Sequence, residues 1–151
     1  MNAPTLHLID LDNLVGGPWN DDLVDAALEE LLRAADHTDG DHVVVAAEAA
    51  LAKKAFFGLP VSARMLVGRG PDGADTALVE HLPAEHIERR YSRLVIASGD
   101  GRFAELAEQV QSLRPMVEVY ARPRSISRRL KSVSRWVELA GLAELIRRCR
   151  G

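Results

Sequence analysis

The sequence has a single cysteine, few aromatic residues and no long apolar run, and each shortage excludes a class of protein. Cys149 stands alone, so the chain can form neither an internal disulfide nor a cysteine-based zinc cluster. No apolar stretch approaches the roughly 20 residues that cross a bilayer, and the N-terminus lacks the basic-then-apolar design of a signal peptide. We therefore expect a soluble, cytoplasmic protein without redox chemistry.

The chain also has little net charge, −3, but its charges are unevenly distributed. Residues 1–75 hold 13 acidic and 5 basic residues, whereas residues 76–151 hold 9 acidic and 14 basic residues. The densest basic stretch is Arg122–Arg135, which contains six basic residues, four serines and no acid. Such a run is most often a solvated helix face, but it also suits the neutralisation of phosphates.

The length of 151 residues predicts a single domain, 1–151, with one core. Short apolar runs rich in β-branched residues predict five strands, over Thr5–Asp10, His42–Ala46, Ala63–Val67, Arg93–Ala97 and Val117–Tyr120. Helical spacing predicts helices between them and at the end, over Asp21–Ala35, Ala49–Phe57, Asp75–Arg90, Arg102–Leu113 and about Val137–Arg148. This alternation predicts an α/β fold of three layers, α/β/α, with a largely parallel five-stranded sheet. His7 is expected in or near the core, and so are Trp136, Val137 and Leu139.

Three predicted strands are followed by carboxylates, at the edge where open parallel sheets bind ligands. The segments are Asp10-Leu11-Asp12-Asn13, Asp72-Gly73-Ala74-Asp75 and Ser98-Gly99-Asp100-Gly101. Each acid alone is most simply a helix cap or a turn residue. Together they would gather negative charge in one cleft, which favours a bound cation. Oxygen ligands without a histidine pair indicate Mg²⁺ or Mn²⁺ rather than zinc.

The segments His7–Leu14 (HLIDLDNL), Gly73–Leu78 (GADTAL) and Ala97–Phe103 (ASGDGRF) resemble, in order and spacing, the signature of NYN-domain nucleases, a branch of the PIN-like superfamily. The resemblance implies a metal-dependent ribonuclease (a hydrolase) with a sheet in the order 3-2-1-4-5. It also implies site roles: Asp10, Asp75 and Asp100 match the catalytic, metal-binding acids, Asn13 the residue that orders the first loop, and Ser98 the hydroxyl beside the metal.

One position departs from the pattern of that family, which often has a further acid where this chain has Arg102. Loss of that acid weakens the case for a second metal ion, although an arginine there can hold a phosphate oxygen or stabilise transition-state charge. Asp12 is either a substitute ligand or a loop residue that faces solvent.

The resemblance also suggests a purpose for the basic segment, because it follows the fifth strand at the same edge as the acids. Four of its arginines are candidates to guide the backbone of single-stranded RNA toward the metal, namely Arg122, Arg124, Arg128 and Arg129. Trp19 either stacks on an unpaired base or, as is commoner for tryptophan, packs on the following helix. The sequence is also compatible with a homo-oligomer or with a complex with another protein.

Three other interpretations compete with a nuclease. A PIN-like domain can bind RNA or a protein without cutting it, and Arg102 favours that alternative. Asp10-Leu11-Asp12 resembles the acid pair of haloacid-dehalogenase-like phosphatases, but Ser98 stands too close to Asp100 to leave room for the lysine of that family. Gly68–Gly73 is formally a dinucleotide-binding GxGxxG, yet it follows the third strand and contains Pro71.

Overall fold

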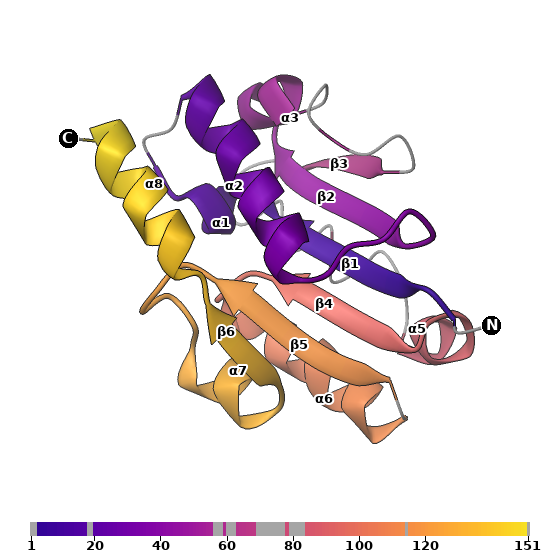
Figure 1. Cartoon of the computed structure of the whole chain (residues 1–151). Coiled ribbons are helices and arrows are strands. Elements are labelled where there is room, and N and C mark those ends of the chain that lie inside the picture. Colours follow the sequence, from indigo (N-terminus) through magenta and orange to yellow (C-terminus); the bar gives the residue numbers. More distant parts are fainter. Residues whose placement is uncertain are drawn as a thin grey trace.

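The structure is a computed structural model that describes residues 3–17, 20–55, 59, 63–68, 78, 84–113 and 115–150. Its centre is a parallel sheet of six strands in the order β3-β2-β1-β4-β5-β6 (Figure 1). The strands are β1 (Thr5–Asp10), β2 (His42–Glu48), β3 (Arg64–Gly68), β4 (Arg93–Ala97), β5 (Met116–Ala121) and β6 (Arg135–Glu138). The α/β class and the parallel sheet are confirmed, whereas the count of five strands is wrong.

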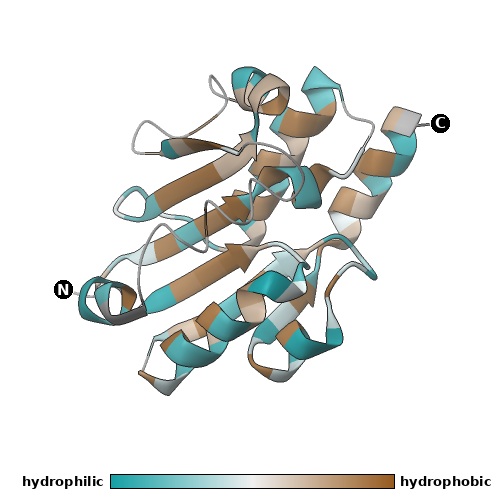
Figure 2. Cartoon of the chain, turned by 180° about the vertical axis from the view of Figure 1, so that it is seen from behind, coloured by the Kyte–Doolittle hydropathy of each residue, from teal (hydrophilic) through white to brown (hydrophobic). Residues whose placement is uncertain are grey.

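Helices cover both faces of the sheet (Figures 1 and 2). On one face lie α1 (Leu11–Val15), α2 (Asp21–Ala34), α3 (Ala49–Ala55) and α8 (Ala140–Arg150). On the other lie α5 (Ala84–Arg90), the 3-10 turn η2 (Gly101–Phe103), α6 (Ala104–Ser112) and α7 (Arg128–Ser132). Side chains of β1 alternate between two cores: Leu6 and Leu8 pack under α5 and α6, and Ile9 packs under α2. All of β1 is buried, including its polar residues Thr5, His7 and Asp10, as expected for a central strand of a parallel sheet.

The sixth strand explains the largest differences between the expected and the observed elements. β6 pairs in parallel with β5, and three of its four residues are exposed, so it lacks the apolar run of a buried strand. Trp136 and Val137 are 45% and 42% exposed, so their assignment to the core is wrong, whereas Leu139 is buried as expected. The last helix begins at Ala140 instead of Val137 because β6 occupies the residues before it.

The basic segment is partly helical. Ser127 caps α7, its hydroxyl accepting a hydrogen bond from the Leu130 amide at 3.1 Å. The predicted helix Asp75–Arg90 is described only from Ala84 onward, apart from Leu78. Within the described ranges, no helix combines the length and the apolar composition needed to cross a bilayer.

Candidate functional site

The first residue of the site, Asp10, lies where β1 ends and α1 begins. Its carboxylate is 3% exposed and is the N-cap of α1, with its Oδ1 at 3.5 Å from the Asn13 amide. A helix N-terminus favours a carboxylate at this position. The sequence Asp-x-x-Asn thus folds into a tight turn that holds a buried acid at the carboxyl edge of the central strand.

Ser98, directly after β4, connects Asp10 to Asp100. Ser98 is fully buried, and its Oγ donates to Asp10 Oδ2 at 3.0 Å while accepting from the Asp100 amide at 3.1 Å. The Asp100 carboxylate in turn accepts from the Arg102 amide at 2.9 Å. Because β1 and β4 are neighbours in the sheet, the two predicted acids lie at the same edge, with one hydroxyl between them.

Asn13 ties three loops together. Its side-chain Oδ1 accepts from the Gly99 amide at 2.9 Å, and its backbone oxygen accepts from Arg122 Nε at 2.7 Å. The loops after β1, β4 and β5 therefore share one residue. This geometry agrees with the expected role of Asn13 in ordering the first loop, and it gives Arg122 a position beside the acids.

Gly99 is required by a close approach of backbones that sequence reasoning missed. A Cβ added at Gly99 would lie 2.2 Å from the Ser125 carbonyl oxygen, so no larger residue fits without a shift. The Ser127 amide also donates to the Gly99 carbonyl at 2.8 Å. The acidic loop and the basic segment are thus in direct contact.

Asp12 has a different neighbourhood from Asp10. Its Oδ2 accepts from the Glu48 amide at 3.0 Å, at the end of β2. Burial raises the pKa of Asp12, and the Glu48 carboxylate adds to this effect, against the hydrogen bond from the Glu48 amide. Glu48 is an acid at the same edge of the sheet that the sequence analysis did not single out, because the predicted strand ended two residues earlier, at Ala46. Its Oε1 caps the following helix through the Leu51 amide at 2.9 Å.

The third predicted acid, Asp75, lies outside the described residues, as do Trp19 and the turn after Gly68. Among the residues that the structure describes, no three His, Cys, Asp or Glu side chains gather closely enough to hold a metal ion. The described oxygen donors near Ser98 come from two acids, Asp10 and Asp100, a set that suits a hard cation. The three-acid site therefore remains a prediction that depends on Asp75.

The predicted RNA-binding arginines differ in their surroundings. Arg128 and Arg129 are exposed in the first turn of α7. Arg124 is also exposed and has a left-handed backbone with φ of 65°, and its amide donates to Glu138 Oε1 at 3.1 Å. Arg102 has an exposed side chain in the turn after Asp100. Arg122 is partly buried, and its Nε donates to the Asn13 carbonyl in the loop after β1.

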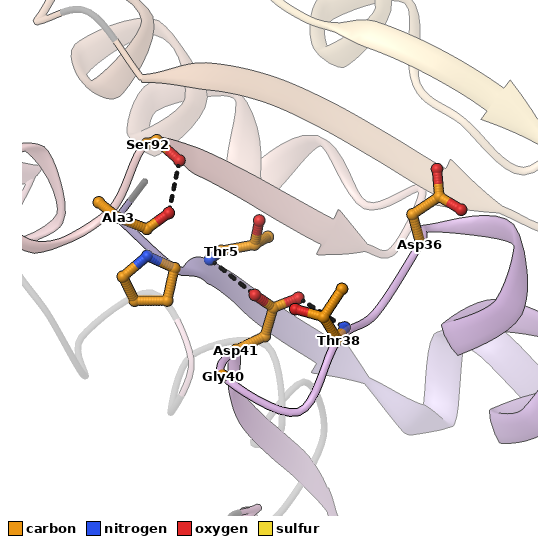
Figure 3. A pocket seen from close by; sticks show the side chains of 8 residues that line it. Ala3, Thr5, Asp36, Thr38, Gly40, Asp41 and Ser92 are labelled. Carbon is orange, nitrogen blue, oxygen red and sulfur yellow. Dashed lines mark hydrogen bonds between the residues drawn. The ribbon is translucent and has the colours of Figure 1, made fainter. Parts of the chain in front are cut away.

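A hollow of about 390 Å³ lies at the opposite, amino end of the sheet (Figure 3). It is lined by Ala3, Pro4, Thr5, Asp36, Thr38, Gly40, Asp41 and Ser92. Both Asp41 oxygens are engaged: Oδ1 accepts from the Thr5 amide, and Oδ2 from the Thr38 amide and His7 Nε2, each at 3.0 Å. The buried Asp41 carboxylate already binds the Thr5 amide, the Thr38 amide and the His7 ring. We therefore assign this hollow a structural role.

The pair of His7 and Asp41 makes stability depend on pH. Burial lowers the pKa of His7 below its ordinary 6.5, against the hydrogen bond and charge of Asp41, which raise it. Burial would raise the pKa of Asp41, but hydrogen bonds from His7, Thr5 and Thr38 outweigh it and lower the pKa to about 2. Neutral His7 therefore donates through Nε2 to an ionised carboxylate.

Both shifts have the same sign for stability, because the unfolded chain binds more protons than the folded one. We expect the free energy of unfolding to fall as the pH drops below 6.5, where His7 contributes, and to fall further from pH 3.8 to about 2, where Asp41 contributes. Urea unfolding between pH 7 and about pH 2 measures this. Asp41→Asn should be about 1–3 kcal/mol less stable at pH 7, with a flatter acid profile; an unchanged profile would contradict the assignment.

Comparison with known proteins supports the fold alone. No protein-family model and no curated protein matches this chain. One solved structure that resembles it is a protein of unknown function from Vibrio parahaemolyticus, with a TM-score of 0.60 and 17% sequence identity. The match covers 93% of this chain and 95% of that one. The chain is thus similar over almost its whole length to a protein whose function is unknown.

Proposed function

We propose that this protein is a metal-dependent ribonuclease of the NYN branch of the PIN-like superfamily, which hydrolyses phosphodiester bonds of single-stranded RNA. The observation that carries the proposal is the link from Asp10 through the Ser98 hydroxyl to the Asp100 loop. The order of the first five strands, β3-β2-β1-β4-β5, agrees with the order that the resemblance implies, and β6 extends it.

The residues divide the work in the following way. Asp10 and Asp100, with Asp75, would hold Mg²⁺ or Mn²⁺, which supplies Lewis acidity toward a phosphate oxygen and acidifies a water molecule. The Ser98 hydroxyl fixes one oxygen of Asp10, and the Arg102 amide fixes one oxygen of Asp100. Such second contacts orient ligands and commonly matter 10- to 100-fold for affinity or activity, as a rough range. Arg122, Arg128 and Arg129 bind the RNA phosphates.

A second candidate function is RNA binding without cleavage, and Arg102 favours it. Arg102 stands where the family often has a further acid, so a cation at this site would have one carboxylate fewer to hold it. A phosphatase is less well supported, because Asp12 bonds to the Glu48 amide, in a role that stabilises the turn at the end of β2.

Cleavage of a labelled single-stranded RNA by the purified protein tests the proposal. We expect cutting with Mn²⁺ or Mg²⁺ and none with EDTA, because the carboxylates need a cation to act on a phosphate. Readdition of the metal after EDTA should restore cutting. Binding of RNA with no cutting in either metal would favour the binding module, and cutting that persists in EDTA would refute the metal mechanism.

A further inference from the structure

The edge of the sheet formed by β5 and β6 has large apolar side chains that are exposed to solvent. Within the described part of the chain, the large apolar side chains that are exposed are Val67, Met116, Trp136 and Val137. The last three belong to these two neighbouring strands. Trp136 lies on one face of this edge, and Met116 and Val137 lie on the other. An exposed tryptophan is a kind of residue that is enriched at interaction sites. This edge is therefore the place to look for a partner.

Trp136 is the largest of these groups, and its orientation is fixed. It pairs with Val119, whose side chain belongs to the core under α6 and α7, so Trp136 is on the same face as α7. The Lys131 ammonium lies over the indole at 4.4 Å from the ring centroid. The residue still keeps 45% of its surface exposed. A cation thus holds the ring while much of it stays open to solvent.

The surface around Trp136 is positively charged. Arg128 and Arg129 are exposed on α7. Arg135 lies on the other face of β6, where its Nη1 is 3.9 Å from Met116 Sδ. Nearby acids are engaged or set apart: Glu118 pairs with Arg93, and Glu138 accepts from the Arg124 amide. Glu108 faces α7 from α6, across a hollow of about 360 Å³ that Ser132 also lines. A polyanion is therefore favoured along α7 itself.

We propose that Trp136 and Lys131, with Arg128 and Arg129, form a platform for single-stranded nucleic acid, on which one base stacks on the indole while its phosphates lie along α7. Stacking on an aromatic ring beside a basic track is the way in which proteins bind unpaired strands. Bases in a duplex are already stacked and unavailable to the ring. The platform therefore selects single strands.

The platform is joined to the proposed cleavage site, and in that sense it rests on the proposed function. The residue that caps α7, Ser127, donates its amide to the Gly99 carbonyl, one residue before Asp100. A strand that lies along α7 is thereby led toward the loop that carries Asp100. To the single-stranded substrate of that site, the inference adds the groups that hold a base and its phosphates.

Fluorescence titration with a 15-nucleotide oligouridylate in EDTA tests the platform without requiring cleavage. The Trp19→Phe background leaves Trp136 as the only tryptophan, so quenching of its emission reports contact with the base. We expect quenching by the oligouridylate, and weaker binding of a blunt RNA duplex. Trp136→Ala should weaken binding about tenfold; in the same titration followed by anisotropy, Trp136→Phe should keep most of the affinity. Val137→Ala, on the opposite face of the same strand, is the matched control and should bind normally.

The outcomes separate this inference from the proposed function. If the protein cuts RNA but Trp136→Ala binds and cuts as wild type, the platform is refuted and the nuclease stands. If Trp136 is quenched but nothing is cut, the platform stands and the nuclease fails. If no oligouridylate binds, the platform fails. A dimer in light scattering that both Trp136→Ala and Val137→Ala dissociate, without quenching, would show that this edge binds a second copy instead and would overturn the inference.

Discussion

Replacement of Asp10 by Asn is expected to lower metal-dependent cleavage of RNA by more than about 100-fold. The amide keeps the shape of the carboxylate and can still accept the hydrogen bond from Ser98, but it removes the negative charge that would hold the cation. Since no cavity opens at this buried position, the fold should persist. Initial rates of cleavage at saturating Mn²⁺, beside thermal denaturation of the same preparations, measure both effects. Asp100→Asn should behave similarly.

Asp36→Asn is the matched control for this substitution. Asp36 is exposed at the opposite end of the sheet and has a left-handed backbone with φ of 53°, which Asn tolerates well. The same chemical change there should leave cleavage at the wild-type rate. If Asp10→Asn and Asp36→Asn cut RNA equally well, Asp10 is not a ligand for the catalytic cation.

Substitution of Gly99 by Ala is expected to reduce both stability and activity. The new Cβ would lie 2.2 Å from the Ser125 carbonyl oxygen, and a backbone atom cannot move aside as a flexible side chain can. Overpacking of this kind costs about 1–3 kcal/mol, or roughly 3–10 °C in Tm for a chain of this size. Separation of the two loops should also displace Asp100. Urea unfolding and RNA cleavage measure the two effects.

Gly40→Ala provides the comparison, because a Cβ at Gly40 meets nothing within 4 Å. This variant should unfold and cleave as wild type does. A Gly99→Ala protein as stable and as active as the Gly40→Ala protein would mean that the loops after β4 and β5 do not need their close contact.

Much of the fold could be predicted from the sequence, because buried parallel strands leave a clear signal. The bounds of β1 and β4 agree with the predicted strands, since both are short, mostly apolar segments. β6 gave no such signal: its sequence, RWVE, has only two apolar residues, between an arginine and a glutamate, at an exposed edge. Trp136, which the sequence analysis places in the core, is exposed on this edge strand, with the Lys131 ammonium over its ring.

Of the site, only the residues that directly follow strands could be predicted. The expectation that acids after different strands share one edge is confirmed for Asp10 and Asp100, because sheet topology alone brings them together. The contact of Gly99 with Ser125 and the bond from Arg122 to Asn13 join residues far apart in the chain. Such contacts depend on the exact path of loops, which local sequence patterns do not encode. Asp75 remains a prediction, outside the described residues.

Asn13 and Gly99 connect three loops, and these contacts limit which parts of the protein can be transferred to another protein on their own. Transfer of Arg122–Arg135 to another scaffold would move its charges but not two of its partners: the Asn13 carbonyl, which accepts from the Arg122 side chain, and the Gly99 carbonyl, which accepts from the Ser127 amide. Chimeras should therefore keep their geometry only when the turn after β1 and the loop after β4 travel with the basic segment. The acidic loops and the basic segment are therefore structurally coupled, and substitutions in either are constrained by the other.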